Sequence, residues 1–296
     1  MKEYKRLKNP IIFIGTGRSG TTIISEMVSR HRDLAYVSNY SEKSPSNVSV
    51  NVARRLFDNR FYRIFGQKKQ LNKVSLINKF AFKPSEAYRM WEYLSGNEIN
   101  FSRDFLIDKP ITEERIDFIR SYFDSMVKFQ NRKRLVFKIT GPSRITYLSK
   151  IFPDAIFIHL KRSYIPTIAS FLKIDFWKTR GAHKLWWTGV YSDEEKKWVS
   201  ENANNEALVT AFQLKKLNDI AELEVKKVQP NYLEVHYEQF VQDPEEEINR
   251  IIEFTALASF DVKKQLEDIK IFNRNKKDSE YFNESDLKEI YKILEG

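Results

Sequence analysis

The chain has 296 residues, of which 42% are hydrophobic and 14% aromatic, enough to build the core of one large α/β domain or two small ones. It contains no cysteine, so disulfides and thiolate metal sites are excluded. Its formal net charge of +10 predicts anionic partners, such as nucleic acid, an anionic membrane face, an acidic glycan or a nucleotide.

The N-terminal segment, residues 1–10, is basic and lacks the apolar stretch of a signal peptide. No apolar run in the sequence approaches the length of a membrane span. The absence of cysteine fits a reducing compartment. These features together predict a cytoplasmic protein without a membrane span.

A glycine-rich loop follows the first predicted strand, Ile11–Ile14, and precedes a segment with helical spacing of its apolar residues. Its sequence, GTGRSGTT, occupies residues 15–22. Glycines let backbone N–H groups turn toward an anion, and the start of a helix adds partial positive charge. Arginine, serine and threonine side chains add donors for phosphate or sulfate oxygens. The residues predicted to hold this anion are Gly17, Arg18, Ser19, Gly20, Thr21 and Thr22.

This loop differs from the phosphate loop of nucleotide triphosphatases. Gly15 and Gly20 have its outer glycine spacing, but Thr21 stands where the phosphate-binding lysine belongs. A kinase or ATPase function is therefore disfavoured. The structural alternative, a tight strand-to-helix turn that holds no ligand, is disfavoured by the combination of Arg18 with three hydroxyl side chains.

A basic segment with helical character follows a second short strand, Leu34–Ser38, and a polar loop that extends to residue 49. The helical pattern breaks near Gly66. A new helix is expected to start at Pro84, since proline is favourable at the first position of a helix. We interpret residues 51–131 as a mostly helical insertion within one domain of residues 1–296, and as a candidate region for acceptor recognition. A surface that only keeps the protein soluble is an equally favoured alternative.

The rest of the chain alternates between helices and strands. Amphipathic spacing predicts a helix over residues 112–131. Strands are predicted at residues 135–139, 155–160 and 232–237, and further helices at 142–152, 165–172, 193–201, 206–227, 244–257 and 286–294, with an aromatic, basic loop over 173–191. This alternation predicts an α/β fold, a P-loop-like three-layer sandwich with a central parallel sheet flanked by helices. Ligands bind such sheets at the carboxyl ends of the strands.

A second candidate anion site follows the strand at residues 155–160. Arg162 leaves the carboxyl end of that strand, and Ser170 lies eight residues later, about two helical turns further along. The two side chains are therefore expected to grip one anion.

These motifs resemble those of a known family. The loop GTGRSGTT is similar to the 5′-phosphosulfate loop of sulfotransferases that use 3′-phosphoadenosine 5′-phosphosulfate (PAPS), although that family usually has proline in place of Gly17. Arg162 and Ser170 match the spacing of the arginine and serine that bind the 3′-phosphate in the family. Residues 137–160 and 232–257 also resemble family segments. The overall pattern looks most like the bacterial and Golgi-type branch that sulfates glycans and tyrosyl proteins.

The resemblance implies catalytic roles for three residues. Glu42, in the loop after the second strand, would be the general base, and Lys138, at the end of the third strand, would stabilise the transferring group together with Arg18. A solvated loop glutamate and a lysine that extends to solvent are the alternatives for the first two. His31 and His183 are further candidates for the base.

Other residues belong to the expected nucleotide site by resemblance. Tyr237 is expected mainly to pack, with some contact to the nucleotide. Asn273 and Lys276 lie in a late basic loop expected to close over the nucleotide, and a solvated charge run is the alternative. Two further residues are not assigned to the nucleotide site. Arg144 is expected to be an exposed helical arginine, with binding of an acidic acceptor as the alternative, and His159 a satisfied core residue.

The function predicted from these features is transfer of the sulfuryl group of PAPS to an acceptor hydroxyl by in-line displacement, with release of adenosine 3′,5′-bisphosphate (PAP). A carbohydrate, in particular an acidic glycan, is the first candidate for the acceptor, while tyrosine, a lipid head group and a small metabolite stay open. No metal and no nucleic-acid partner are expected, since no motif has metal-ligand spacing. The alternatives are a non-catalytic protein that binds polyanions or nucleic acid and, less favoured, a nucleotide kinase.

Overall fold

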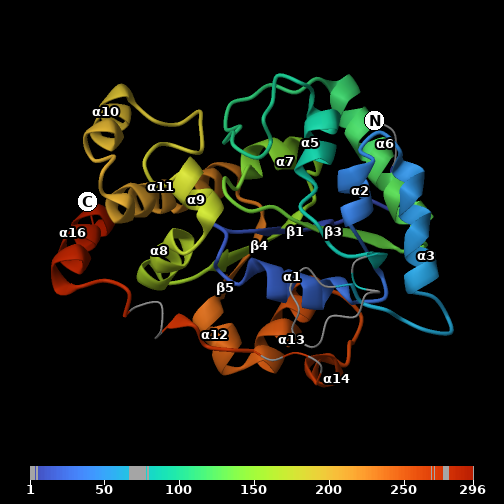
Figure 1. The fold of residues 1–296 in the computed structure, drawn as a ribbon. Coiled ribbons are helices and arrows are strands. Elements are labelled where there is room, and N and C mark those ends of the chain that lie inside the picture. The colour runs from blue at the N-terminus through green and yellow to red at the C-terminus, as the bar shows by residue number, and fades with distance from the viewer. Residues whose placement is uncertain are drawn as a thin grey trace.

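The central element is a parallel β-sheet with the strand order β2-β3-β1-β4-β5 (Figure 1). The structure is a computed structural model that describes residues 4, 6–66, 78, 80–267, 269, 271–275 and 280–295. The strands are β1 (Ile11–Ile14), β2 (Leu34–Tyr36), β3 (Arg134–Lys138), β4 (Ile156–Lys161) and β5 (Asn231–His236). The predicted α/β fold with a helix-flanked parallel sheet is confirmed.

Helices cover both faces of this sheet, because successive side chains of each strand point to opposite sides. Ile12 and Ile14 of β1 belong to one buried cluster, and Ile11 and Phe13 belong to another. On the first face lie α5 (Tyr88–Ser95), α6 (Glu113–Phe129) and α7 (Ile145–Ile151), and on the second lie α1 (Thr21–Ser29), α12 (Tyr237–Gln242), α13 (Pro244–Phe254) and α14 (Val262–Leu266) (Figure 1).

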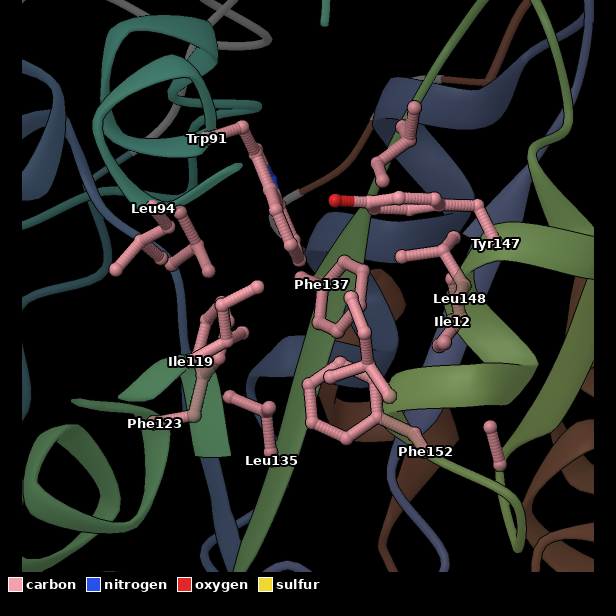
Figure 2. Close-up of a cluster of buried hydrophobic side chains, with 14 of the residues drawn as sticks. Ile12, Trp91, Leu94, Ile119, Phe123, Leu135, Phe137, Tyr147, Leu148 and Phe152 are labelled. Atoms are coloured by element: carbon pink, nitrogen blue, oxygen red, sulfur yellow. The ribbon is translucent and has the colours of Figure 1, made fainter. Parts of the chain in front are cut away.

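Aromatic side chains fix α5 and α6 to the sheet in the first cluster (Figure 2). Trp91 of α5 stacks on Phe101 at 4.6 Å between ring centroids, and Phe123 of α6 stacks on Phe137 of β3 at 5.8 Å. Burial of rings of this size is a large hydrophobic contribution. The position of α5 relative to β3 is therefore set by packing.

A third cluster joins α8 (Tyr164–Leu172), α9 (Asp175–Arg180), α11 (Glu206–Val228) and α16 (Glu284–Glu295). Trp177 is fully buried there, and its indole Nε1 donates to Thr210 Oγ1 at 2.9 Å. The predicted loop over residues 173–191 thus contains a helix, α9, and is anchored to the core by its tryptophans. Trp198 of the helix α10 (Asp193–Glu201) packs against this cluster, and α10 begins with a capping box at Ser192.

The segment after β2 differs from its prediction. A helix, α2 (Asn39–Lys43), replaces the expected polar loop, because Ser38 Oγ accepts hydrogen bonds from the backbone N–H groups of residues 40 and 41. A 3₁₀ helix (Val48–Ala53) and the short α3 (Arg54–Phe57) follow. The helix expected to start at Pro84 starts at Tyr88. The described residues between 51 and 131 are therefore less helical than expected.

A buried charge cluster ties α3 to the sheet. Asp58 makes ion pairs with Arg54 at 3.2 Å, Arg63 at 2.7 Å and Arg132 at 2.7 Å. The Arg54 side chain is 1% exposed, and its Nη1 also donates to the Leu34 carbonyl at 2.6 Å. Burial alone raises the pKa of Asp58, but hydrogen bonds and the arginine charges outweigh burial and lower it to about 2.

The side chain of Gln130 closes part of the outer edge of β2. Gln130 Oε1 accepts from the Tyr36 N–H at 3.1 Å, and Gln130 Nε2 donates to the Tyr36 carbonyl at 2.8 Å. The amide is fully buried and also contacts Asn51 and Arg54. One side chain thus satisfies both backbone groups of an edge residue.

No helix in the described part of the chain is long and apolar enough to cross a membrane.

Candidate active site

The glycine-rich loop joins the end of β1 to the start of α1 at the carboxyl edge of the sheet. Gly17, Arg18 and Gly20 have φ values of +82°, +59° and +81°. Proline, with φ near −65°, does not fit at position 17, so glycine there agrees with the loop conformation. A left-handed Arg18 costs roughly 1–2 kcal/mol, and the surrounding contacts must hold it in place.

Two glycines of the loop allow close approach of neighbouring groups. A Cβ on Gly15 would lie 2.7 Å from the Leu160 carbonyl oxygen, and one on Gly20 would lie 2.5 Å from the Tyr237 ring. The Tyr237 hydroxyl donates to the Phe272 carbonyl at 2.9 Å. Tyr237 therefore packs on the loop and links it to the C-terminal segment.

The two predicted anion sites meet at this loop. Arg18 Nε donates to Ser170 Oγ at 3.0 Å, and Arg162 Nη1 donates to the Arg18 carbonyl at 2.9 Å. The Arg162 guanidinium also lies 4.8 Å from the Tyr237 ring centroid. Residues separated by about 150 positions in sequence thus form one cluster at the ends of β1 and β4.

A C-terminal residue that was not predicted also contacts Arg162. Asn275 Oδ1 accepts from Arg162 Nε at 2.8 Å, and its Nδ2 donates to Glu238 Oε1 at 2.7 Å. Burial alone raises the pKa of Glu238, but hydrogen bonds from Ser163 hold that pKa below its ordinary value. Asn275 lies in the predicted basic loop, which was its only signal in the sequence.

The structure describes one of the two residues predicted in the late basic loop. Asn273 is exposed and accepts from the backbone N–H of residue 275 at 3.0 Å. Lys276 lies outside the described residues.

A cavity of about 200 Å³ opens between the loop, α8 and the C-terminal segment. Its polar lining includes Arg18, Gly20, Thr21, Thr22, Arg162, Ser170 and Arg274. Its apolar lining includes Ile23, Phe240, Ile271 and Phe272. Ser19 is fully buried beside it, and the Ser19 hydroxyl has no hydrogen-bond partner within the described part of the chain.

The ammonium group of Lys138, at the end of β3, contacts this loop. Lys138 Nζ donates to Thr22 Oγ1 at 3.1 Å and forms an ion pair with Glu86 Oε1 at 2.9 Å. The Lys138 side chain is 10% exposed and that of Glu86 is 11% exposed. Lys138 is therefore not a lysine that extends into solvent.

Glu86 was not predicted, and the fold explains its position. The chain before α5 runs antiparallel to the continuation of β2, with an isolated bridge between Ser38 and Pro84. The Ser85 N–H donates to the Val37 carbonyl at 2.9 Å. Residue 86 is thereby brought to the carboxyl edge of the sheet, next to β3. No local sequence signal reports such a long-range pairing.

Glu42 lies in α2, and its carboxylate points to the start of α5. Glu42 Oε2 accepts from the Arg89 N–H at 3.2 Å, within the first turn of that helix. A carboxylate is favourable there because the N-terminal N–H groups of a helix lack intrahelical partners. Through this contact Glu42 stabilises the start of α5.

His31, His159 and His183 bond to groups outside the glycine-rich loop. His31 is buried near the end of α1, and burial lowers its pKa. His159 is buried in β4, as predicted, and burial lowers its pKa to about 3. His183 pairs with Glu206 at 3.1 Å. Among the described residues, no group of three or more His, Cys, Asp or Glu side chains is arranged to hold a metal ion.

Arg144 was expected to be exposed, and this prediction is wrong. Its side chain is fully buried, its Nε donates to the Asp104 carbonyl at 2.9 Å and its Nη1 to the Pro142 carbonyl at 2.7 Å. Burial lowers the pKa of Arg144 to about 10. The reason is that α7 begins only at Ile145, so residue 144 stands at the helix start, with φ +54°, and turns inward.

The aromatic loop borders the same edge of the sheet. The Gly141 N–H donates to the Gly15 carbonyl at 3.0 Å, and a Cβ on Gly141 would lie 2.8 Å from Trp187 Nε1. The adjacent Trp186 ring has the guanidinium groups of Arg103 and Arg180 at 4.7 Å and 5.1 Å from its centroid. Rings and cations thus gather near the glycine-rich loop.

A parallel sheet that carries a glycine-rich loop between its first strand and first helix defines the class of P-loop-like α/β proteins. The family model described as "Sulfotransferase family" matches residues 10–261. The chain therefore belongs to the sulfotransferase family.

Solved structures agree at the level of the fold. Sulfotransferase STF9 from Mycobacterium avium matches with a TM-score of 0.56 and 14% identity, over 98% of this chain and 76% of that chain. Sulfotransferase STF1 from Mycobacterium tuberculosis H37Rv matches with a TM-score of 0.51 and 15% identity, over 98% of this chain and 77% of that chain. No curated protein sequence matches this chain.

Proposed function

We propose that this sulfotransferase takes its sulfuryl group from PAPS and transfers it to an acceptor hydroxyl. The observation that carries the proposal is the contact between the two predicted anion sites. Arg18 bonds to Ser170 and receives a bond from Arg162, all on the lining of one cavity. A nucleotide with anionic groups at both its 5′ and 3′ positions suits such a paired site.

The chemistry of the cavity suits the parts of this donor. The buried hydroxyl of Ser19, which has no hydrogen-bond partner among the described residues, and the N-terminus of α1 would offer donors to the 5′-phosphosulfate. Arg162 and Ser170 would hold the 3′-phosphate. The apolar side chains of Phe240 and Phe272 on the same lining suit the flat face of adenine.

Fixed positive charge supports direct displacement at sulfur. PAPS, when bound, supplies an activated sulfuryl group whose leaving group is a nucleotide phosphate. Arg18 and Lys138, which contact Ser170 and Thr22, would stabilise the charge that develops on the sulfuryl oxygens and on the leaving phosphate. The function of Glu42 as general base stays a prediction from the family resemblance, tested below.

A carbohydrate hydroxyl is the acceptor that we propose. Trp186 and Trp187, with Arg103 and Arg180, form an aromatic and cationic border near the loop. Aromatic rings stack on sugars, and guanidinium groups pair with acidic substituents. This composition, with the resemblance to the glycan-sulfating branch, supports an acidic glycan over an uncharged small molecule.

The competing functions have less support. A nucleotide kinase would need a lysine at position 21 of the loop, where this chain has Thr21. A non-catalytic polyanion-binding protein is favoured only by the net charge of +10, and it would not need contacts between Arg18, Arg162 and Ser170.

Calorimetric titration with PAP, beside 5′-AMP and beside ATP with magnesium, tests the donor. We expect PAP to bind at least roughly tenfold more tightly than 5′-AMP, and we expect Arg162→Ala to remove this preference, because it deletes a charged contact to the 3′-phosphate. Lys216→Ala, a change at a lysine paired with Glu195, is a matched control for loss of positive charge. Equal binding of PAP and 5′-AMP to the unmodified protein would refute PAPS as the donor.

A further inference from the structure

The ion pair between Glu86 and Lys138 lies next to the loop, and the proposed function uses Lys138 but gives Glu86 no role. Both side chains are about nine-tenths buried. Lys138 Nζ contacts Glu86 Oε1 at 2.9 Å on one side and Thr22 Oγ1 at 3.1 Å on the other. Thr22 lines the cavity, so a single lysine side chain lies between that wall and the carboxylate.

The second oxygen of Glu86 is held equally firmly. Glu86 Oε2 accepts from the Tyr88 hydroxyl at 2.5 Å and from Thr140 Oγ1 at 2.6 Å. Thr140 follows β3, and Tyr88 begins α5. Burial and the neighbouring Glu86 carboxylate both raise the pKa of Tyr88, so this hydroxyl stays a donor. The Glu86 carboxylate is therefore oriented by three donors, one on Oε1 and two on Oε2.

The carboxylates of Glu42 and Glu86 have different contacts. The Glu42 carboxylate accepts from the N–H of Arg89 in the first turn of α5, whereas Glu86 contacts the lysine that touches the loop. A general base must lie within hydrogen-bond reach of the proton that it takes. The contact chain from Thr22 through Lys138 leads to Glu86.

We propose that Glu86 is the general base of the reaction and that Lys138 holds it in reserve until the donor is bound. This inference rests on the proposed function. The sulfuryl oxygens and the bridging oxygen of the donor attract Lys138, whose ammonium then turns from Glu86 Oε1 toward the loop. Tyr88 and Thr140 keep the released carboxylate in place, with Oε1 facing the acceptor.

The proton and electron balance of the step is complete. The acceptor oxygen forms a bond to sulfur and gives its proton to Glu86 Oε1. The bond between sulfur and the bridging oxygen breaks, and its electron pair stays on the phosphate of the departing PAP. Glu86 returns the proton to water after the products leave, and Lys138 pairs with it again. No oxidant, metal or further reactant is needed.

Binding of PAP, without any acceptor, tests whether the ion pair between Lys138 and Glu86 competes with the donor for Lys138. In Glu86→Gln, Lys138 no longer has a carboxylate to hold it, so we expect PAP to bind roughly threefold or more tightly than in the unmodified chain. In a Lys138→Met background the same Glu86 change should leave PAP affinity unaltered, because the coupling has lost one partner. Glu247→Gln is the matched control, because the Glu247 side chain is also 11% exposed and pairs with Arg250 at 2.8 Å, and it should leave PAP affinity unchanged.

Turnover tests the base. The readout is PAP released from PAPS with unsulfated heparosan or water as acceptor. We expect Glu86→Gln to lower the rate roughly 100- to 10,000-fold and Glu86→Asp to restore part of it. The control Glu247→Gln should stay within about threefold of the unmodified chain, and Glu42→Gln is measured beside them as the competing candidate for the base. Melting temperatures of all variants check that each one folds.

The outcomes separate the two proposals. A chain that does not prefer PAP over 5′-AMP contradicts the proposed function itself. A chain that prefers PAP, but whose Glu86→Gln variant keeps turnover within tenfold or binds PAP more weakly, overturns the role of Glu86 and leaves the donor site intact. A 100-fold loss in Glu42→Gln with no loss in Glu86→Gln would return the base to Glu42.

Discussion

Gly17 is the residue at which the loop departs from the pattern that the family resemblance implies. Its φ of +82° belongs to the left-handed region, where proline does not occur and where alanine is strained. A Cβ at this position would lie 3.4 Å from the Phe171 ring, which is ordinary contact. Backbone conformation, rather than space, is therefore what requires glycine here.

Substitutions at this position separate conformation from side-chain size. We expect Gly17→Ala to cost about 1 kcal/mol of unfolding free energy and to keep PAP binding within tenfold. Gly17→Pro should lower PAP affinity at least roughly 100-fold, because the chain must leave the left-handed region and the anion loses its aligned N–H groups. Urea unfolding and calorimetry measure the two quantities.

The control for this series is Gly189→Ala, at a glycine with φ +104° where an added Cβ would have no atom within 4 Å. It should show a similar stability cost without any change in PAP affinity. Unimpaired PAP binding by Gly17→Pro would mean that the donor does not need this loop conformation.

At the scale of residues, the sequence predicted those site residues whose positions depend on spacing within one strand or helix. The loop residues and the pair Arg162 and Ser170 follow from spacing along one strand and one helix, and the structure brings them together. Glu86 was not predictable, because its position depends on pairing of the chain near Pro84 with the end of β2. Arg144 was mispredicted because a helix boundary moved by three residues and reversed its exposure.

At the scale of elements, the apolar runs predicted every strand of the described sheet to within two residues at each end. The prediction for the segment after β2 was wrong for a physical reason. It contains short helices that are held by a side-chain cap and by the buried charges around Asp58, and neither gives a periodic apolar pattern. Tertiary contacts decide the local structure there.

The Asp58 cluster makes an element-level prediction about acid. The pKa of Asp58 in the folded chain, about 2, is below its ordinary value of 3.8, so the carboxylate contributes stability above pH 4. That contribution, on the order of 2 kcal/mol, is lost as the pH falls from about 4 to 2. Unfolding free energies measured by urea titration across this range should fall accordingly.

Asp58→Asn is the comparison that isolates this carboxylate. It leaves the buried Arg54 guanidinium without its charge partner, so we expect a loss of roughly 3–5 kcal/mol at neutral pH. The variant should also show a flatter dependence on pH below 4, since one titrating group is gone. An unchanged slope in the variant would assign the acid sensitivity to other carboxylates.

At the scale of the whole molecule, alternating strands and helices predicted the α/β fold, and the sequence could not predict how the C-terminal segment returns to the donor site. Ile271 and Phe272 line the cavity and Asn275 contacts Arg162, although all three lie more than 100 residues beyond Arg162 in the sequence. The loop from β1, the helix after β4 and this segment therefore meet only in the folded chain.

Donor binding should consequently stabilise the entire fold. At a PAP concentration of 100 times its Kd, we expect a gain of about 2.7 kcal/mol, which corresponds to a rise in Tm of roughly 5 °C or more. Differential scanning calorimetry measures it. The same PAP concentration should leave the Tm of Arg162→Ala nearly unchanged, and an equal rise in that variant would place PAP elsewhere on the molecule.

The Gln130 amide at the edge of β2 has a consequence for the behaviour of this chain among its own copies. An open sheet edge offers unpaired backbone groups on which a strand of another molecule can add, and this addition is a route to aggregation. At Tyr36 those groups already bond to Gln130. Because the amide comes from the same chain, it blocks the edge at every protein concentration, and its loss would open a short template for fibrillar growth.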